Sequence, residues 1–121
     1  MRHEDTPDTR AGRADRLPED AFLGVARTEA VLREGIERVL ATRDLSIAQY
    51  NVLRMLRGAG DVGLCRNDVR DRLITRMPDV TRLLDRMEAV GLIRRERDTT
   101  DRRLVHATLT PHGRRVVDAL D

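Results

Sequence analysis

The stretch that decides the fold is residues 79–113, DVTRLLDRMEAVGLIRRERDTTDRRLVHATLTPHG. Its first part places apolar residues at helical spacing and ends at Gly91, a residue suited to a helix C-terminus. After Gly91 the apolar period shifts toward two on both sides of the polar turn DTTDRR, which is typical of an antiparallel hairpin. Thr110 and Pro111 then have the form of an N-cap and a first helical turn. The stretch predicts a helix, a hairpin with an arginine-bearing tip, and a second short helix.

The first of these helices is predicted over about residues 76–90, with Thr75 and Pro78 as start signals. Helical spacing gives it an inner, apolar face made of Val80, Leu83, Leu84, Met87 and Val90. The outer face holds Asp79, Thr81, Arg82, Asp85, Arg86 and Ala89. This polar face is free to bind another molecule.

Three more helices are predicted upstream. A long first helix runs from Pro18, and its apolar stripe consists of Phe22, Val25, Leu32, Ile36, Val39 and Leu40. A second helix is capped by Ser46 and Gln49 and stops around Gly58 or Gly60. A brief extended piece at Val62 to Leu64 precedes a third helix, in which Val69 and Leu73 face inward.

Length and composition limit the classes of protein to which the chain can belong. The 121 residues suit one domain, mainly α with a small β-hairpin (α+β), over residues 19–121. Residues 1–18 are dense in charge, Pro and Gly, so we expect a flexible arm there. No apolar run has membrane-spanning or signal-peptide character, which favours a cytoplasmic protein with no membrane contact.

The sequence lacks the residues that several other functions require. The lone Cys65 excludes an internal disulfide, and we expect it to be a small buried or capping residue rather than a redox sensor. The three histidines, His3, His106 and His112, are scattered, so no metal site is predicted. No nucleophile, base or phosphate-cradling loop stands out, and we therefore predict no cofactor and no enzyme activity. Only Phe22 and Tyr50 are aromatic, which disfavours base stacking on single strands.

The order of elements is that of a winged helix-turn-helix. In such folds one helix enters the major groove of duplex DNA, and the hairpin, or wing, reaches phosphate or the adjacent minor groove. The wing is expected over about residues 94–109. Alternation along the strand sends Arg94, Arg95 and Arg97 to different faces, so at least one of them should be solvated.

Residues 46–113 resemble the MarR family of bacterial regulators, named for multiple antibiotic resistance. The similarity is carried by VTRLLDRME, by GLIRR, by the DRR of the wing and by LTPHG. It implies that Thr81, Arg82 and the outward-facing Arg86 lie on the recognition helix. Its groove-facing start would comprise Arg76, Met77, Pro78 and Asp79. Arg82 could bind guanine, or instead touch only phosphate or pair with Asp79 or Asp85.

The resemblance also assigns roles in the wing. It makes Asp101 a brace that orients Arg103 toward a narrow minor groove, with Arg102 beside it on the DNA backbone. The alternative is a solvated hairpin with an exposed ion pair of little energetic value. The position of the DRR sequence next to a recognition helix favours the DNA contact.

Family members dimerise through the first helix and two helices after the wing, and they bind small-molecule effectors. This chain reaches Asp121 soon after its last helix begins, so we expect a homodimer through the first helix and the last short helix. Its last helix would contribute Val116, Val117 and Leu120. A small-molecule effector remains open, and no ligand is assigned.

Two functions follow. The first is a sequence-specific double-stranded DNA-binding transcriptional regulator, with repression as the expected mode. The second is a winged-helix protein-interaction module that has lost DNA binding. The net charge of only +2 and the short C-terminal part make the second possible, and Asp79, Asp85 and Glu88 on the recognition helix would repel phosphate if they faced it. Salt dependence of duplex binding discriminates between them.

Overall fold

The computed structural model describes residues 9–74 and 78–121. The chain divides into two compact units, one that ends at Arg38 and one that begins at Val39. Helix α1, Thr9–Ala41, crosses this division. The division falls there because Leu40, near the end of α1, is the first buried core residue along the described chain.

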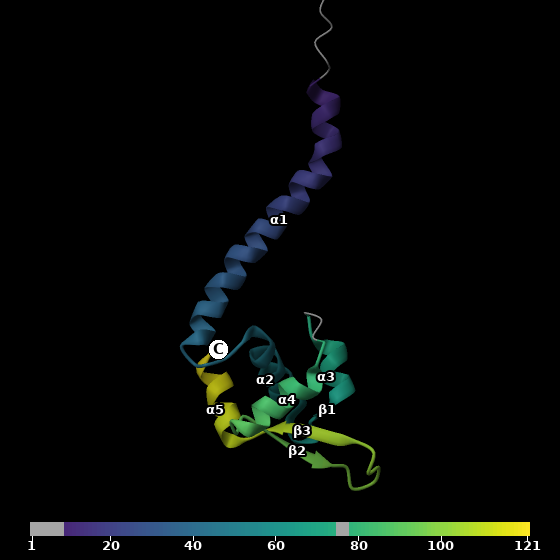
Figure 1. Cartoon of the computed structure of the whole chain (residues 1–121), viewed down its shortest axis with the longest axis vertical. Coiled ribbons are helices and arrows are strands. Elements are labelled where there is room, and N and C mark those ends of the chain that lie inside the picture. The colour runs from purple at the N-terminus through teal and green to yellow at the C-terminus, as the bar shows by residue number, and fades with distance from the viewer. Residues whose placement is uncertain (1–8, 75–77) are drawn as a thin grey trace, which may run out of the picture. The chain divides into compact units, whose positions relative to one another are not determined.

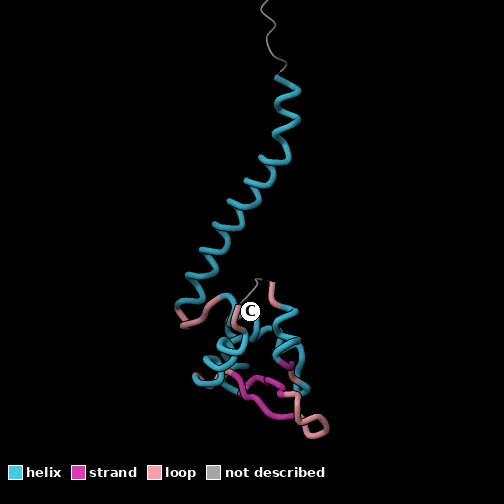
Figure 2. Tube along the Cα trace, turned by 45° about the vertical axis from the view of Figure 1, so that its right-hand side comes forward, coloured by secondary structure: helices cyan, strands magenta, loops and turns pink. Residues whose placement is uncertain are grey.

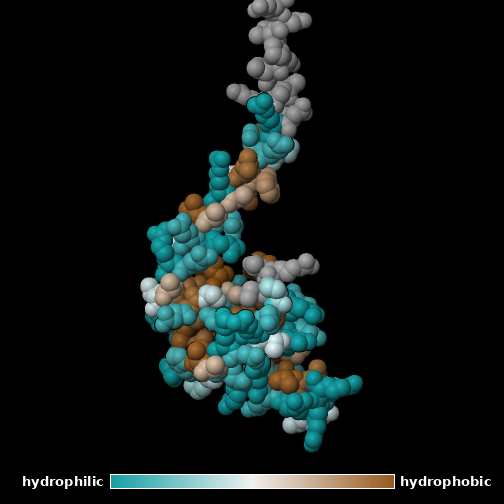
Figure 3. All heavy atoms as spheres, in the orientation of Figure 1, coloured by the Kyte–Doolittle hydropathy of each residue, from teal (hydrophilic) through white to brown (hydrophobic). Residues whose placement is uncertain are grey.

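Helix α1 is longer than predicted. Residues 9–18, predicted as part of a flexible arm, are helical, with Pro18 inside the helix. Six of residues 9–17 are Ala, Arg or Leu, which carry little helical cost and favour the early start. Of the predicted apolar stripe Leu40 is buried, whereas the residues before it are exposed: Phe22 is 72% exposed and Leu32 is 61% exposed. Brown apolar side chains interrupt the teal surface of this helix in Figure 3.

The next elements follow the predicted order. Helix α2, Ile47–Ala59, begins with a reciprocal cap: Ser46 Oγ accepts the Gln49 N–H, and Gln49 Oε1 accepts the Ser46 N–H. The short 3₁₀ turn η1, Gly60–Val62, replaces the start of the predicted extended piece, and strand β1 is Leu64–Cys65. Helix α3, Arg66–Arg72, buries Val69, as predicted.

Helix α4, Val80–Ala89, starts later than the predicted residue 76. Its start is set by Asp79, whose Oδ1 accepts the Arg82 N–H at 2.9 Å, so Pro78 precedes the cap instead of opening the helix. Its end at Gly91 is confirmed: Gly91 has a φ of 77°, and Leu92 N–H donates to the Met87 carbonyl at 2.9 Å. Because the chain leaves the helix here, Val90 is 62% exposed, and its predicted burial is wrong.

The predicted hairpin is strand β2, Ile93–Arg97, paired antiparallel with strand β3, Val105–Leu109. Strand β1 adds to the free side of β3, which gives a three-stranded sheet of order β1-β3-β2. Gly63 permits this pairing, since a Cβ on it would meet the backbone carbonyl of Ala107. In Figures 1 and 2 the hairpin extends past the helices as the wing.

Helix α5, Pro111–Ala119, begins at the predicted cap, where Thr110 Oγ1 accepts the Gly113 N–H at 3.0 Å. Its Val117 is fully buried in the core of the second unit, so its predicted place in a dimer surface is wrong. The helical period turns Val117 inward, and only Val116 and Leu120 keep partial exposure. The mainly helical fold with a small antiparallel wing is as predicted.

Candidate nucleic-acid interface

The outer face of α4 carries two exposed arginines, Arg82 and Arg86. They are four residues apart, so they lie one above the other on the same side of the helix. Within the described residues, neither guanidinium forms an ion pair. The predicted alternative of Arg82 paired with Asp79 or Asp85 is therefore not seen: Asp79 binds the backbone N–H of Arg82, and Asp85 binds another arginine.

That other arginine is Arg95 on β2. Its Nη2 lies 2.5 Å from Asp85 Oδ1 and 3.0 Å from Glu88 Oε1, and its backbone N–H donates to Glu88 Oε2 at 3.0 Å. The hydrogen bond from Arg95 holds the pKa of the Glu88 carboxyl below its ordinary value. Asp85 and Glu88, two of the three acids expected to repel phosphate, thus share one guanidinium on the flank of α4 that faces the sheet, which leaves this cluster with one net negative charge.

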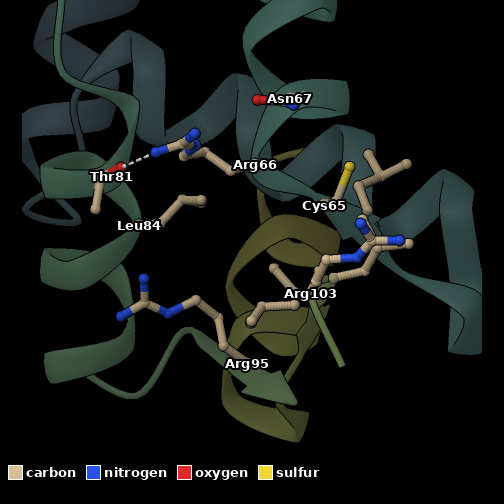
Figure 4. Close-up of a pocket in the computed structure, with 11 residues that line it drawn as sticks. Cys65, Arg66, Asn67, Thr81, Leu84, Arg95 and Arg103 are labelled. Atoms are coloured by element: carbon tan, nitrogen blue, oxygen red, sulfur yellow. Dashed lines mark hydrogen bonds between the residues drawn. The ribbon is translucent and has the colours of Figure 1, made fainter. Parts of the chain in front are cut away.

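The side chain of Thr81, on α4, is bound by a residue of α3. Arg66, at the start of α3, donates from Nη1 to Thr81 Oγ1 at 3.2 Å, and both side chains are exposed. Figure 4 shows the guanidinium of Arg66 directed at this hydroxyl across the gap between α3 and α4. The orientation of Thr81 is thereby fixed by a neighbouring helix.

The tip of the wing is built around the predicted DRR sequence. Asp101 Oδ1 accepts from the Arg103 backbone N–H at 3.1 Å and lies 3.3 Å from Arg103 Nε. The Arg103 side chain nevertheless remains 91% exposed. Arg102 is also exposed, and its carbonyl accepts from Arg97 Nη1 at 2.6 Å. The contact expected between Asp101 and Arg103 is present.

Asp98 shapes the turn that carries those residues. Its Oδ1 accepts from the Thr100 N–H at 2.7 Å, from the Thr100 hydroxyl at 2.6 Å and from the Asp101 N–H at 3.0 Å. Its Oδ2 lies 2.9 Å from His106 Nε2. These hydrogen bonds, with that of the Thr100 hydroxyl first, hold the pKa of Asp98 far below its ordinary value. The turn is fixed by one carboxylate.

A hollow of about 430 Å³ lies between α3, α4 and the wing. Arg66, Arg95 and Arg103 approach it from three elements, and Leu84 lies between them (Figure 4). Cys65 lies at its edge. Its backbone N–H and its Sγ lie 3.4 and 3.1 Å from Asp68 Oδ2, which is a capping arrangement for α3, as predicted.

The structure brings most of the predicted site residues into one unit. Pro78 and Asp79 lie at the start of α4, Thr81, Arg82 and Arg86 lie on it, and the wing carries Asp101, Arg102 and Arg103. The predicted Arg76 and Met77 lie outside the described residues. Sequence reasoning missed Arg66, Arg95 and Asp98. For Arg66 the one available signal was an arginine pair four residues apart, Arg66 and Arg70, on the helix before the recognition helix.

Two further properties concern the described residues alone. They contain no cluster of three or more His, Cys, Asp or Glu side chains arranged to hold a metal ion. None of their helices combines the length and apolar character needed to cross a membrane.

Comparison with known proteins gives consistent matches. A sequence profile described as the MarR family matches residues 43–104, just over half of the chain. The HTH-type transcriptional regulator TtmR of Methylorubrum extorquens (strain PA1) is 37% identical over 83 residues, which cover 69% of this chain and 42% of that protein. The chain spans less than half the length of the curated relatives it matches. Both are named as transcriptional regulators rather than enzymes, in agreement with the prediction of no enzyme activity.

Comparison with solved structures also finds MarR-type regulators. A MarR transcription factor from Planctomyces limnophilus has a TM-score of 0.77 and 35% identity, and the match covers 87% of this chain and 76% of that one. A complex of S. aureus MepR with DNA has a TM-score of 0.73 and 27% identity, and that match covers 83% and 72%. These similarities agree with the order of the helices, the capped start of α4 and the DRR sequence of the wing. Together with the profile match, they show that the chain belongs to the MarR family.

Proposed function

We propose that the chain is a sequence-specific double-stranded DNA-binding transcriptional regulator that acts as a repressor in the cytoplasm. Helix α4 enters the major groove, and the wing, about residues 94–109, reaches the adjacent minor groove. The observation that carries the proposal is the separation of charge on α4: Arg82 and Arg86 face outward, while Asp85 and Glu88 are bound to Arg95. The similarity to MepR, solved in complex with DNA, supports the same function.

Each candidate residue has a role in this proposal. Arg82 forms a bidentate contact with guanine, worth about 1–3 kcal/mol of discrimination against another base. Arg86 and Arg102 contact phosphates, which fix the register of the protein on the duplex. Arg103 enters the minor groove, and Asp101 reduces the number of conformations its side chain samples. The start of α4, with Pro78 and Asp79, and the preceding Arg76 and Met77, faces the edges of the bases.

We also propose that two copies of the chain associate through α1. Its exposed stripe includes Phe22, Val25, Leu32, Ile36 and Val39, each at least 48% exposed. Full burial of one such side chain contributes about 1.5–3 kcal/mol, so a symmetric α1 pair can supply substantial association energy. Val116 and Leu120 of α5 join the interface. A two-fold dimer matches half-sites about 34–36 Å apart on a palindromic operator.

The alternative of a protein-interaction module loses part of its support. One of its arguments was that acids of the recognition helix repel phosphate, but Asp85 and Glu88 are both bound to Arg95, which cancels one of their two charges. The third, Asp79, caps α4, where the positive end of the helix dipole offsets its charge.

The test is a fluorescence-anisotropy titration of labelled duplex, taken from the region upstream of the coding sequence and from a random-sequence pool. Wild type should bind tightly at about 50 mM salt and lose affinity steeply by about 200 mM. Arg103→Ala should weaken binding about tenfold. Arg43→Ala, which removes an exposed arginine from the turn between α1 and α2, serves as the control of equal charge loss and should change little. Absence of wild-type binding to either duplex at about 50 mM salt would overturn the proposal.

A further inference from the structure

A second basic surface lies on α3, next to the start of α4. Arg66 and Arg70 are exposed and four residues apart, so both project from one face of α3. Together with the start of α4 they border a hollow of about 280 Å³. Its lining is Arg66, Arg70, Pro78, Asp79, Val80 and Thr81. Within the described residues, two guanidinium groups therefore face one carboxylate there.

The charges of this hollow favour an anion. Arg66 forms no ion pair with a described carboxylate, and the pair of Arg70 with Asp71 is long, at 3.4 Å, and well exposed. Asp79 directs Oδ1 at the Arg82 N–H, so its charge is already engaged at the end of α4. The guanidinium of Arg66 has five N–H donors, of which one hydrogen bond, to Thr81, is accounted for.

We propose that Arg66 and Arg70 bind a backbone phosphate of duplex DNA in this hollow, and that Arg66 at the same time positions Thr81. The inference rests on the proposed function. The first helix of a helix-turn-helix crosses the DNA backbone while the second reads bases, which brings α3 to phosphate when α4 occupies the groove. A phosphodiester offers two non-bridging oxygens, and planar guanidinium groups bind such oxygens well.

The bond from Arg66 has a chemical consequence for Thr81. Because Oγ1 accepts a hydrogen bond from Arg66, one of its two lone pairs is occupied and the hydroxyl hydrogen is directed elsewhere, so Thr81 can donate and has only one acceptor position left. In the major groove it then favours acceptors, which are guanine O6 and N7, adenine N7 and thymine O4, over the amino group of cytosine. One arginine thus couples backbone binding to base preference.

The phosphate contact is tested by the slope of log Kd against log salt for the full chain on a random-sequence duplex. The double variant Arg66→Ala/Arg70→Ala should lower the slope by about 0.9, the value for one phosphate contact, and Arg66→Ala alone by up to that amount, because Arg70 can still bind the same phosphate. Arg66→Lys keeps the charge and should restore the slope. Arg43→Ala is again the matched control. An unchanged slope in the double variant would overturn the phosphate contact.

The positioning of Thr81 is tested by a double-mutant cycle between Arg66→Lys and Thr81→Val on a duplex selected from a randomised pool. Thr81→Val removes the hydroxyl with little change of shape. Both variants should relax the preference at the same base pair, and their combination should relax it no further. Additive effects, or an Arg66→Lys protein with wild-type preference, would overturn the positioning role.

Failure of this inference is distinguishable from failure of the proposed function. If Arg103→Ala weakens binding while the Arg66 variants match wild type, the chain binds DNA without this contact and the inference is wrong. If wild type binds no duplex, both are wrong. Thermal unfolding of each variant confirms that the loss of an exposed arginine leaves the fold intact.

Discussion

Helices α1 and α4 both carry an apolar stripe at helical spacing, yet the stripes have different surroundings. In α4 the four buried residues Val80, Leu83, Leu84 and Met87 are at most 7% exposed. In α1 the stripe side chains from Phe22 to Val39 are 48–72% exposed. The comparison teaches that an apolar stripe predicts a partner surface, but it does not predict whether that surface lies within the same chain.

The largest expected effect comes from truncating one residue in each stripe. Met87→Ala should lower the free energy of unfolding by about 2–5 kcal/mol, because Met87 is fully buried and its loss leaves a cavity. Leu32→Ala should change it by less than about 0.5 kcal/mol at concentrations where the chain is monomeric. Urea denaturation measures both. Equal effects would mean that the α1 stripe is also covered within the monomer.

The second prediction concerns association through α1. Leu32→Asp places a charge in the proposed dimer interface and should weaken self-association at least tenfold, because burial of an unpaired carboxylate is costly. Sedimentation equilibrium measures this constant. The control is Val62→Asp, at a residue 78% exposed and outside α1, which should associate as wild type does. If both variants associate normally, α1 does not form the interface.

The third prediction concerns the charges on the flank of α4. Arg95→Ala leaves Asp85 and Glu88 unpaired and should cost about 1 kcal/mol of stability, since this half-exposed network is worth little more than surface ion pairs. Two uncompensated acids on α4 should also weaken DNA binding severalfold. Arg94→Ala, which removes an arginine paired with Glu96 on the same strand, should do neither. Wild-type affinity in Arg95→Ala would contradict the neutralising role.

The same pair predicts a pH dependence. The pKa of Glu88 is lowered in the folded protein, so its contribution is present above the unfolded pKa of about 4.3 and is lost as pH falls through the folded pKa. Arg95→Ala should therefore show a shallower loss of stability across the acidic range than wild type. Parallel curves for the two proteins would indicate that Glu88 titrates independently of Arg95.

The smallest expected effect is local to the wing. Asp98→Ala removes the acceptor of the Thr100 and Asp101 N–H groups, and these amides should then exchange with solvent faster. NMR-detected hydrogen exchange measures them one by one, with amides of α2 as the internal reference. Unchanged exchange at both positions would show that the turn does not depend on Asp98.

Much of the second unit could be predicted from local sequence signals. Local signals mark the helix ends at Ser46, Gly91 and Thr110. Each acts through residues three or four apart, so it can be recognised in the sequence without knowledge of the fold. The start of α4 was harder: Thr75 and Pro78 were the predicted start signals, whereas the hydrogen bond of Asp79 to the Arg82 N–H makes Asp79 the cap.

The features that sequence reasoning missed depend on contacts between elements. Arg95 reaches Asp85 only because β2 folds back against α4 after Gly91, and Arg66 reaches Thr81 across 15 residues. Asp98 was read as one more polar turn residue, because its role depends on the register that brings His106 beside it. Charge patterns along the chain show which residues could pair, whereas the fold determines which of them do.

Native mass spectrometry of the wild-type chain with a duplex selected from a randomised pool tests DNA binding and self-association in one measurement. We predict a complex of two chains per duplex that disappears as the ammonium acetate concentration is raised. A duplex that stays free at every protein concentration at low salt would contradict DNA binding by α4 and the wing.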